Sequence, residues 1–125
     1  MRCARVCLLC LVLTALTPAA RAAGAPLFPL ANQVTLVHFE ADWCRPCRYL
    51  ERALAAIAPA YAGRVAFIAV DFDRERALAT SLGISAVPTT LVYDRNGNLA
   101  ARRLGYLDEA DLCRLLDTVL GGNTQ

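Results

Sequence analysis

The chain has 125 residues, which is enough for one domain and too few for two. Its 13 basic residues, all Arg, oppose 11 acidic ones, and the net charge of +2 gives no support to a nucleic-acid binder or a polybasic membrane binder. Hydrophobic residues make up 57% of the chain and charged residues 19%, which excludes a disordered chain.

The first 22 residues have the pattern of a secretory signal peptide. Arg2 and Arg5 precede an uncharged apolar run from Val6 to Leu16, and Ala20 to Ala22 offers a cleavage site with small residues. The run is shorter than the roughly 20 residues of a transmembrane helix, so an uncleaved anchor is the weaker alternative. We expect residues 1–22 to be removed and the mature protein to lie in an oxidising compartment, a bacterial periplasm.

The first predicted strand and helix follow a short lead-in. Residues 23–33 contain two prolines and should be irregular, whereas Val34 to Phe39 is rich in β-branched and apolar residues and predicts a buried strand. Pro46 suits the first turn of a helix, because its missing N–H would have no partner there. Apolar residues then recur at helical spacing until Gly63, which should end the helix; they are Leu50, Leu54, Ile57 and Tyr61.

A second strand and helix are predicted next. Val65 to Val70 is again apolar and should form a strand. Asp73 is expected to cap a helix that runs to Leu82, and Gly83 should stop this helix.

The last part of the chain predicts a hairpin and a helix. Thr89–Tyr93 and Leu99–Leu104 should be strands joined by a turn over Asp94–Asn98, because Asn and Gly tolerate positive φ. Asp108 should cap the last helix, and Gly121 should end it.

The order of these elements predicts an α/β fold in one domain. A strand–helix–strand unit is followed by a helix, a hairpin and a last helix, so the hairpin must add an antiparallel edge to the sheet. We expect a mixed four-stranded sheet with helices on both faces, formed by residues 34–121, with residues 122–125 as a tail.

The segment Trp43–Cys47 connects the first predicted strand and helix and carries the chemistry. Two cysteines three apart in a first helical turn can bring their sulfurs within bonding reach. The N–H groups and partial positive charge of the helix start favour an anion at Cys44, and Arg45 and Arg48 add positive charge. Because a thiolate attacks disulfides, we expect exchange through a mixed disulfide on Cys44 that Cys47 resolves.

With a Trp before the cysteine pair and a Pro inside it, the chain resembles the thioredoxin family from about Val34 to Leu120. Further marks are Phe39 and Ala41 before the Trp, Val87-Pro88-Thr89, and Gly105. The resemblance implies a thioredoxin fold. Because the lead-in is short, we expect its N-terminal part to be shortened.

The resemblance also implies a substrate-binding surface beside the cysteines. It implies a cis bond before Pro88, which would face the cysteine pair, and pairing of the Val87 backbone with an extended substrate segment. Trp43 would shield the sulfurs and offer a flat contact surface. Gly105 is also expected to belong to the substrate-binding surface.

Two residues are candidates for exchanging a proton with Cys47. His38 stands where the family usually has a buried Asp, and an imidazole suits proton transfer at neutral pH. Glu51 lies four residues after Cys47 on the same helix face. The alternatives are a neutral structural histidine and a solvated carboxylate. Glu40, where the family often has an aromatic residue, is expected to be a surface residue.

The sequence therefore predicts an exported thiol–disulfide oxidoreductase of the protein-disulfide reductase type. The Asp-Trp-Cys triplet and Glu51 resemble the exported thioredoxin-like domains of membrane electron-transfer systems, which usually act as reductants. We expect protein thiols and disulfides as partners, with a membrane electron donor as one candidate. We expect no nucleic acid, no cofactor, no metal, and a monomer.

Two other functions stay open at this point. The first is a binding module with a static disulfide. The second is a metal- or metallocentre-assembly factor, although two thiolates need more ligands and the expected mature chain has no second CxxC. A third cysteine of the mature chain, Cys113, is expected to be a small buried hydrophobe, the alternative being an exposed thiol that dimerises the protein.

Overall fold

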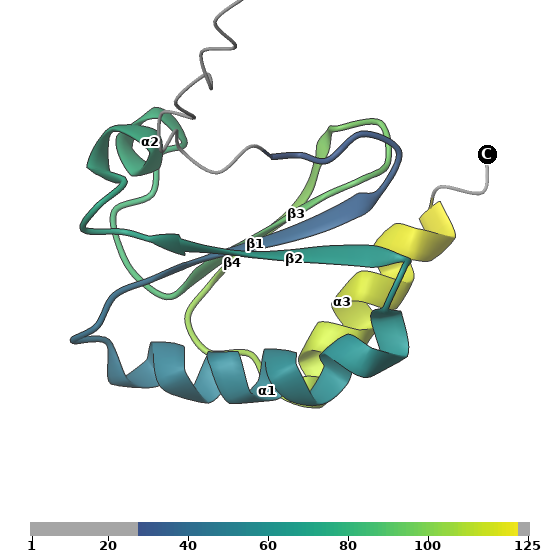
Figure 1. The fold of residues 1–125 in the computed structure, drawn as a ribbon, viewed down its shortest axis with the longest axis horizontal. Coiled ribbons are helices and arrows are strands. Elements are labelled where there is room, and N and C mark those ends of the chain that lie inside the picture. Colours follow the sequence, from purple (N-terminus) through teal and green to yellow (C-terminus); the bar gives the residue numbers. More distant parts are fainter. Residues whose placement is uncertain (1–27, 123–125) are drawn as a thin grey trace, which may run out of the picture.

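The computed structural model describes residues 28–122 (Figure 1). The expected signal peptide at residues 1–22 lies outside the described residues. The elements are, in chain order, β1 (Val34–Glu40), α1 (Arg45–Tyr61), β2 (Val65–Asp71), α2 (Arg76–Ser81), β3 (Thr89–Tyr93), β4 (Leu99–Leu104) and α3 (Glu109–Gly122). Residues 28–33, ahead of β1, belong to no helix or strand. Within the described range, no helix combines the length and apolar composition needed to cross a membrane.

The four strands form one mixed sheet in the order β2-β1-β3-β4. β1 pairs with β2 in parallel and with β3 in antiparallel orientation, and β3 pairs with β4 in the hairpin. Helices α1 and α3 cover one face of the sheet and α2 covers the other (Figure 1). The predicted fold class is therefore confirmed.

The central position of β1 explains why this strand is buried. Its side chains alternate between the two faces, so Leu36 packs toward α1 and α3 while Val37 and Phe39 pack toward α2. Because both faces are covered, the strand is buried nearly throughout. His38 and Glu40 follow Leu36 at intervals of two residues along β1. Their side chains therefore point to the same face of the sheet as Leu36, the face that α1 covers.

The helix boundaries agree with the predictions in part. The Asp108 carboxylate accepts the N–H of Asp111 at 2.8 Å and so caps α3 as expected. The expected cap at Asp73 is wrong: α2 begins at Arg76, and the Glu75 side chain before it makes no capping hydrogen bond. Helix α3 also continues past Gly121 to Gly122.

Candidate active site

The two cysteines lie where β1 leads into α1. Cys44 is the N-cap residue of α1, and its Sγ accepts the N–H of Cys47 at 3.2 Å. The two residues are joined by a disulfide, and each is only 3% exposed. In the dithiol form, the same N–H group and the start of the helix would stabilise a thiolate on Cys44. The expected juxtaposition of the two sulfurs is therefore confirmed.

A second loop meets the cysteines from the start of β3. The Val87–Pro88 peptide bond is cis, as the resemblance implies, and the Val87 side chain packs against the cluster of Ala41 and the two cysteines. The N–H of Gly105 donates to the Pro88 carbonyl at 2.8 Å. Gly105 has φ of 91°, a left-handed conformation that suits glycine. The structure thus brings Val87, Pro88 and Gly105 together.

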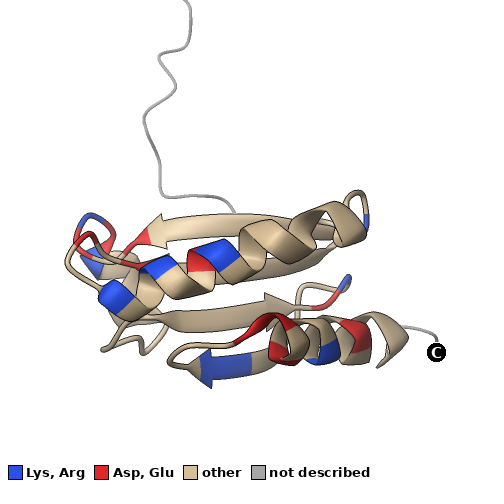
Figure 2. Cartoon of the chain, turned by 90° about the horizontal axis from the view of Figure 1, so that it is seen from below, with Lys and Arg blue, Asp and Glu red and all other residues tan. Residues whose placement is uncertain are grey.

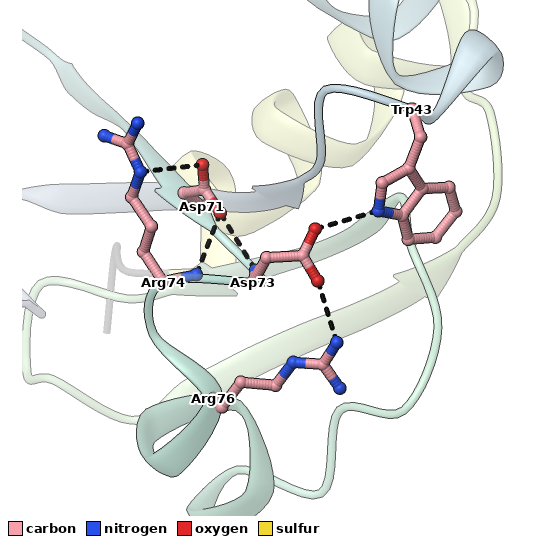
Figure 3. Close-up of polar contacts among 5 residues, drawn as sticks. All are labelled: Trp43, Asp71, Asp73, Arg74 and Arg76. Atoms are coloured by element: carbon pink, nitrogen blue, oxygen red, sulfur yellow. Dashed lines mark hydrogen bonds and ion pairs between the residues drawn. The ribbon is translucent and has the colours of Figure 1, made fainter.

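Trp43 is held on the surface by a residue of the β2–α2 connection. The indole ring is 67% exposed, and its Nε1–H donates to the Asp73 carboxylate at 2.8 Å (Figure 3). The other carboxylate oxygen of Asp73 pairs with Arg76 at 2.8 Å. Asp71 accepts the N–H groups of Asp73 and Arg74, which closes the turn that presents Asp73. Sequence reasoning missed this role of Asp73, because nothing local connects it to Trp43.

A cluster of three titratable side chains lies behind Cys47, on the α1 face of β1. His38 is buried, and its Nε2 lies 3.2 Å from Oε2 of Glu40, whereas its Nδ1 has no hydrogen-bond partner among residues 28–122. Glu40 and Glu51 approach each other, and one ligand atom of each of the three residues lies within 4.8 Å of the other two. The structure therefore brings the two predicted proton carriers together and adds Glu40.

Burial and like charges perturb this cluster. Burial lowers the pKa of His38, with the charge of Glu51 acting in the opposite direction. Burial also raises the pKa of Glu40 to about 7, helped by the charge and a hydrogen bond of Glu51 and by the charges of Asp71 and Asp42. Glu40 is thus no ordinary surface residue. Glu40 lies two residues after His38 on a predicted strand. This spacing could have shown from the sequence that both side chains point to the same face of the sheet.

The same carboxylates surround a surface pocket beside Cys47. The pocket has a volume of about 330 Å³ and is lined by Glu40, Ala41, Asp42, Cys47, Arg48, Glu51 and Asp71. Arg48 is its one cation, and its guanidinium donates to the Asp42 carbonyl at 3.1 Å. The acidic ends of two strands and the first turn of α1 lie at the same end of the molecule (Figure 2).

The donor set of this cluster does not define a closed metal centre. One imidazole and two carboxylates lie close enough together, but a structural zinc site has four ligands, and Glu51 is exposed. Cys47, the remaining soft donor of the pocket, is bonded to Cys44.

The third cysteine of the expected mature chain lies on α3, away from the disulfide. Cys113 is a free cysteine of intermediate burial that packs against the core between the sheet and the helices α1 and α3. Its carbonyl lies 3.4 Å from the Tyr61 hydroxyl, which donates to Asp117 at 2.8 Å. Its side chain is therefore largely a packing element.

Comparison with known proteins agrees with this geometry. The model of the Thioredoxin family matches residues 28–118. A thioredoxin of Haemophilus influenzae is 30% identical over 82 residues, which cover 66% of this chain and 76% of the relative. The chloroplastic thioredoxin M3 of Oryza sativa is 33% identical over 90 residues, 72% of this chain and about half (51%) of the relative.

Solved structures show the same fold. Chloroplastic thioredoxin z is 28% identical, with a TM-score of 0.68 over 73% of this chain and 81% of that structure. The thioredoxin-2 of a malaria parasite has the same TM-score over 76% of this chain and 94% of that one, at 22% identity, which bears on the fold alone.

Proposed function

The chain belongs to the thioredoxin family, and from that premise we propose that it is an exported oxidoreductase that reduces disulfides of protein substrates through Cys44 and Cys47. One observation carries the proposal. Cys44 occupies the N-cap of α1, where its sulfur accepts a backbone N–H and lies within bonding reach of Cys47. This is the setting that favours a reactive thiolate over a thiol.

The exchange proceeds in two steps that conserve electrons. The Cys44 thiolate attacks one sulfur of the substrate disulfide, forms a mixed disulfide and releases the other substrate sulfur as a thiolate. Cys47 then loses its proton and attacks Cys44 Sγ, which forms the Cys44–Cys47 disulfide and releases the second substrate thiolate. The substrate gains two electrons and two protons, and the dithiol loses them.

The surroundings of the disulfide favour an extended substrate segment. Val87 precedes β3 and lies outside its ladder with β1 and β4, so its backbone suits pairing with an added strand. Gly105 is tied to Pro88 on one side of this segment, and Trp43 offers an exposed aromatic surface. These contacts act mainly through backbone and ring surface, which suits protein substrates of varied sequence.

The reduction potential tests the proposed direction of electron flow. The protein lacking residues 1–22 is equilibrated in dithiol/disulfide buffers, and the state of Cys44 and Cys47 is read by thiol labelling, with Cys113→Ala as the background to remove the third thiol. We expect a potential near the roughly −270 mV of thioredoxin. A potential near the roughly −120 mV of a strong oxidant would overturn the reductant role. A pair that never exchanges would overturn the oxidoreductase and leave a binding module.

Export is part of the proposal and rests on the pattern of residues 1–22. Cell fractionation and mass spectrometry of the N-terminus test it. We expect a periplasmic protein that begins at Ala23. An intact N-terminus in the cytoplasm would remove export from the proposal without touching the disulfide chemistry.

We further propose a monomer that receives its electrons from a membrane donor. A monomer fits the partly buried position of Cys113 on α3, which leaves little thiol surface for an intermolecular disulfide. Light scattering of the oxidised protein tests whether it is a monomer. Loss of the reduced form in cells that lack membrane thiol carriers tests the membrane electron donor.

A further inference from the structure

An aromatic pair lies beside the surface on which a substrate segment would bind. Tyr49 in α1 and Tyr106 in the connection between β4 and α3 have ring centroids 6.4 Å apart, in an edge-to-face arrangement. These residues are 45% and 52% exposed, and neither belongs to the core between the sheet and α1. Tyr106 follows Gly105, whose N–H donates to the Pro88 carbonyl. The aromatic pair therefore continues the surface beside the disulfide.

Two arginines of α1 add positive charge to this aromatic pair. Arg45 precedes Tyr49 by four residues and Arg52 follows it by three, so the three side chains share one face of the helix. The Arg52 guanidinium lies over the Tyr49 ring, 5.9 Å from its centroid. Figure 2 shows that the basic residues of α1 lie in the half of the helix that begins at the disulfide. Aromatic surface and positive charge thus occur together next to the cysteines.

The protein itself leaves these two cations without a counter-charge. Neither Arg45 nor Arg52 has an ion-pair partner among residues 28–122. Glu51, the one acidic residue of α1, lines the pocket of about 330 Å³ with the other active-site carboxylates, and Asp108 caps α3. A carboxylate can accept two parallel hydrogen bonds from a guanidinium, so acidic side chains are the protein groups that fit these cations best.

We propose that a Tyr–Arg subsite beside the disulfide selects protein substrates with acidic side chains next to their own disulfide. The subsite consists of Arg45, Tyr49, Arg52 and Tyr106. This inference rests on the proposed function, the reduction of protein disulfides. The rings bind the backbone and apolar parts of the substrate segment, and the guanidinium groups pair with its carboxylates; Tyr and Arg are residue types that contribute strongly at protein interfaces. The subsite adds a charge preference to contacts that otherwise tolerate varied sequences.

The test compares disulfide-bonded peptides that differ only in the two residues beside the cysteine, which are both Asp, both Ser or both Lys. Reduced protein lacking residues 1–22 is mixed with each peptide, and chromatography of the released thiol gives the second-order rate constant. Each constant is divided by that of dithiothreitol with the same peptide, which removes the peptide's own reactivity. We expect the wild type to prefer the Asp peptide over the Ser peptide about tenfold, because each exposed ion pair contributes up to about fivefold. At 1 M salt, which screens charges beyond about 3 Å, the preference should disappear.

Variants of the subsite separate its charges from its rings. Arg52→Gln should lower the preference for the Asp peptide to about threefold, and the double variant Arg45→Gln, Arg52→Gln should abolish it. Because Arg45 lies between the two cysteines and also affects the thiolate, the ratio between peptides is compared rather than the rate itself. Tyr106→Ala should slow the Asp and Ser peptides several-fold more than it slows bis(2-hydroxyethyl) disulfide, which is too small to reach the subsite. Arg95→Gln, an exposed change of the same charge in the β3–β4 turn, is the matched control and should keep the wild-type preference.

Three results would overturn the Tyr–Arg subsite. The first is a wild type that reduces the three peptides at the same relative rate. The second is an equal loss of preference in Arg52→Gln and Arg95→Gln, because net charge alone would then explain it. The third is binding to phosphatidylglycerol vesicles that the double variant loses, without a preference among the peptides, which would assign the arginines to a membrane surface. A wild type that fails to reduce bis(2-hydroxyethyl) disulfide contradicts the proposed function, whereas its reduction without discrimination among the peptides contradicts the subsite alone.

Discussion

Trp43 donates its indole N–H to the carboxylate of Asp73, 30 residues further along the chain, across 2.8 Å. The bond joins the turn that carries Cys44 to the connection between β2 and α2. It holds a ring that is two-thirds exposed, so packing alone does not fix the orientation of this ring. The bond to Asp73 is therefore the polar contact that orients the Trp43 ring beside the disulfide.

Replacing Asp73 should loosen Trp43 and weaken substrate binding. In Asp73→Ala we expect lower fluorescence anisotropy of Trp43 and a several-fold higher KM for a protein disulfide, with kcat nearly unchanged. Because the contact is exposed, the free energy of unfolding should fall by less than about 1.5 kcal/mol. Arg76→Ala is the matched control: it removes the exposed ion pair with Asp73 and the contact of Arg76 with the Phe72 ring but leaves the indole bond in place. A rise in KM as large as that in Asp73→Ala would contradict the role of the indole bond.

Replacing Cys47 should trap substrates. In Cys47→Ser the Cys44 thiolate still attacks, but no second thiol resolves the mixed disulfide, so complexes should accumulate in cells and disappear on reduction. Non-reducing electrophoresis with mass spectrometry measures them. Cys44→Ser should trap far fewer complexes, because the cysteine at the N-cap is the attacking group. Equal trapping by both variants would contradict the assignment of the two roles.

The stability of the oxidised protein should depend on Glu40 between about pH 4.5 and 7. The folded state keeps a proton on Glu40 up to about pH 7, whereas the unfolded state releases it near 4.5. The folded state thus binds more protons, and this residue lowers the free energy of unfolding as pH rises through that window. The lowered pKa of His38 acts in the opposite direction below its usual value of 6.5.

Glu40→Gln should remove the contribution of Glu40. Urea unfolding at pH 5, 6 and 7.5 measures the effect, and the variant should gain stability relative to wild type as the pH increases. Glu109→Gln, an exposed change at the start of α3, serves as control. A difference between Glu40→Gln and wild type that stays constant with pH would show that Glu40 titrates normally.

The contact between α1 and α3 should depend on the hydroxyl of Tyr61. This residue is 4% exposed, and its hydroxyl donates to Asp117 at 2.8 Å. Tyr61→Phe should lower the free energy of unfolding by about 0.5–1.5 kcal/mol without changing the exchange rate, because the ring stays in place and the exposed Asp117 regains water. Thermal unfolding measures the stability, and the rate at which the reduced protein reacts with glutathione disulfide measures the exchange. Tyr49→Phe, at an exposed position, should change stability by less than about 0.5 kcal/mol.

The sequence by itself determined the elements whose causes are local. Strand and helix periodicities, the turn over Asp94–Asn98 and the cap at Asp108 all depend on residues a few positions apart, and the structure contains them. The cysteine pair belongs to the same class, because three residues of helix bring its sulfurs together. Helix ends were less certain: glycine at 121 did not stop α3, since a glycine can remain helical at modest cost.

Only the tertiary structure decided which distant polar groups meet. Parallel pairing places Glu40 of β1 opposite Asp71 of β2, and α1 folds back to bring Glu51 to the same pocket. The raised pKa of Glu40 arises first from burial and then from Glu51 and Asp71, which only folding brings near, with a smaller contribution from its sequence neighbour Asp42. Asp73 likewise does not cap α2, as the sequence predicted, but accepts a hydrogen bond from the Trp43 indole. Short-range patterns encode backbone conformation, whereas the electrostatic environment of a side chain depends on elements that only folding brings together.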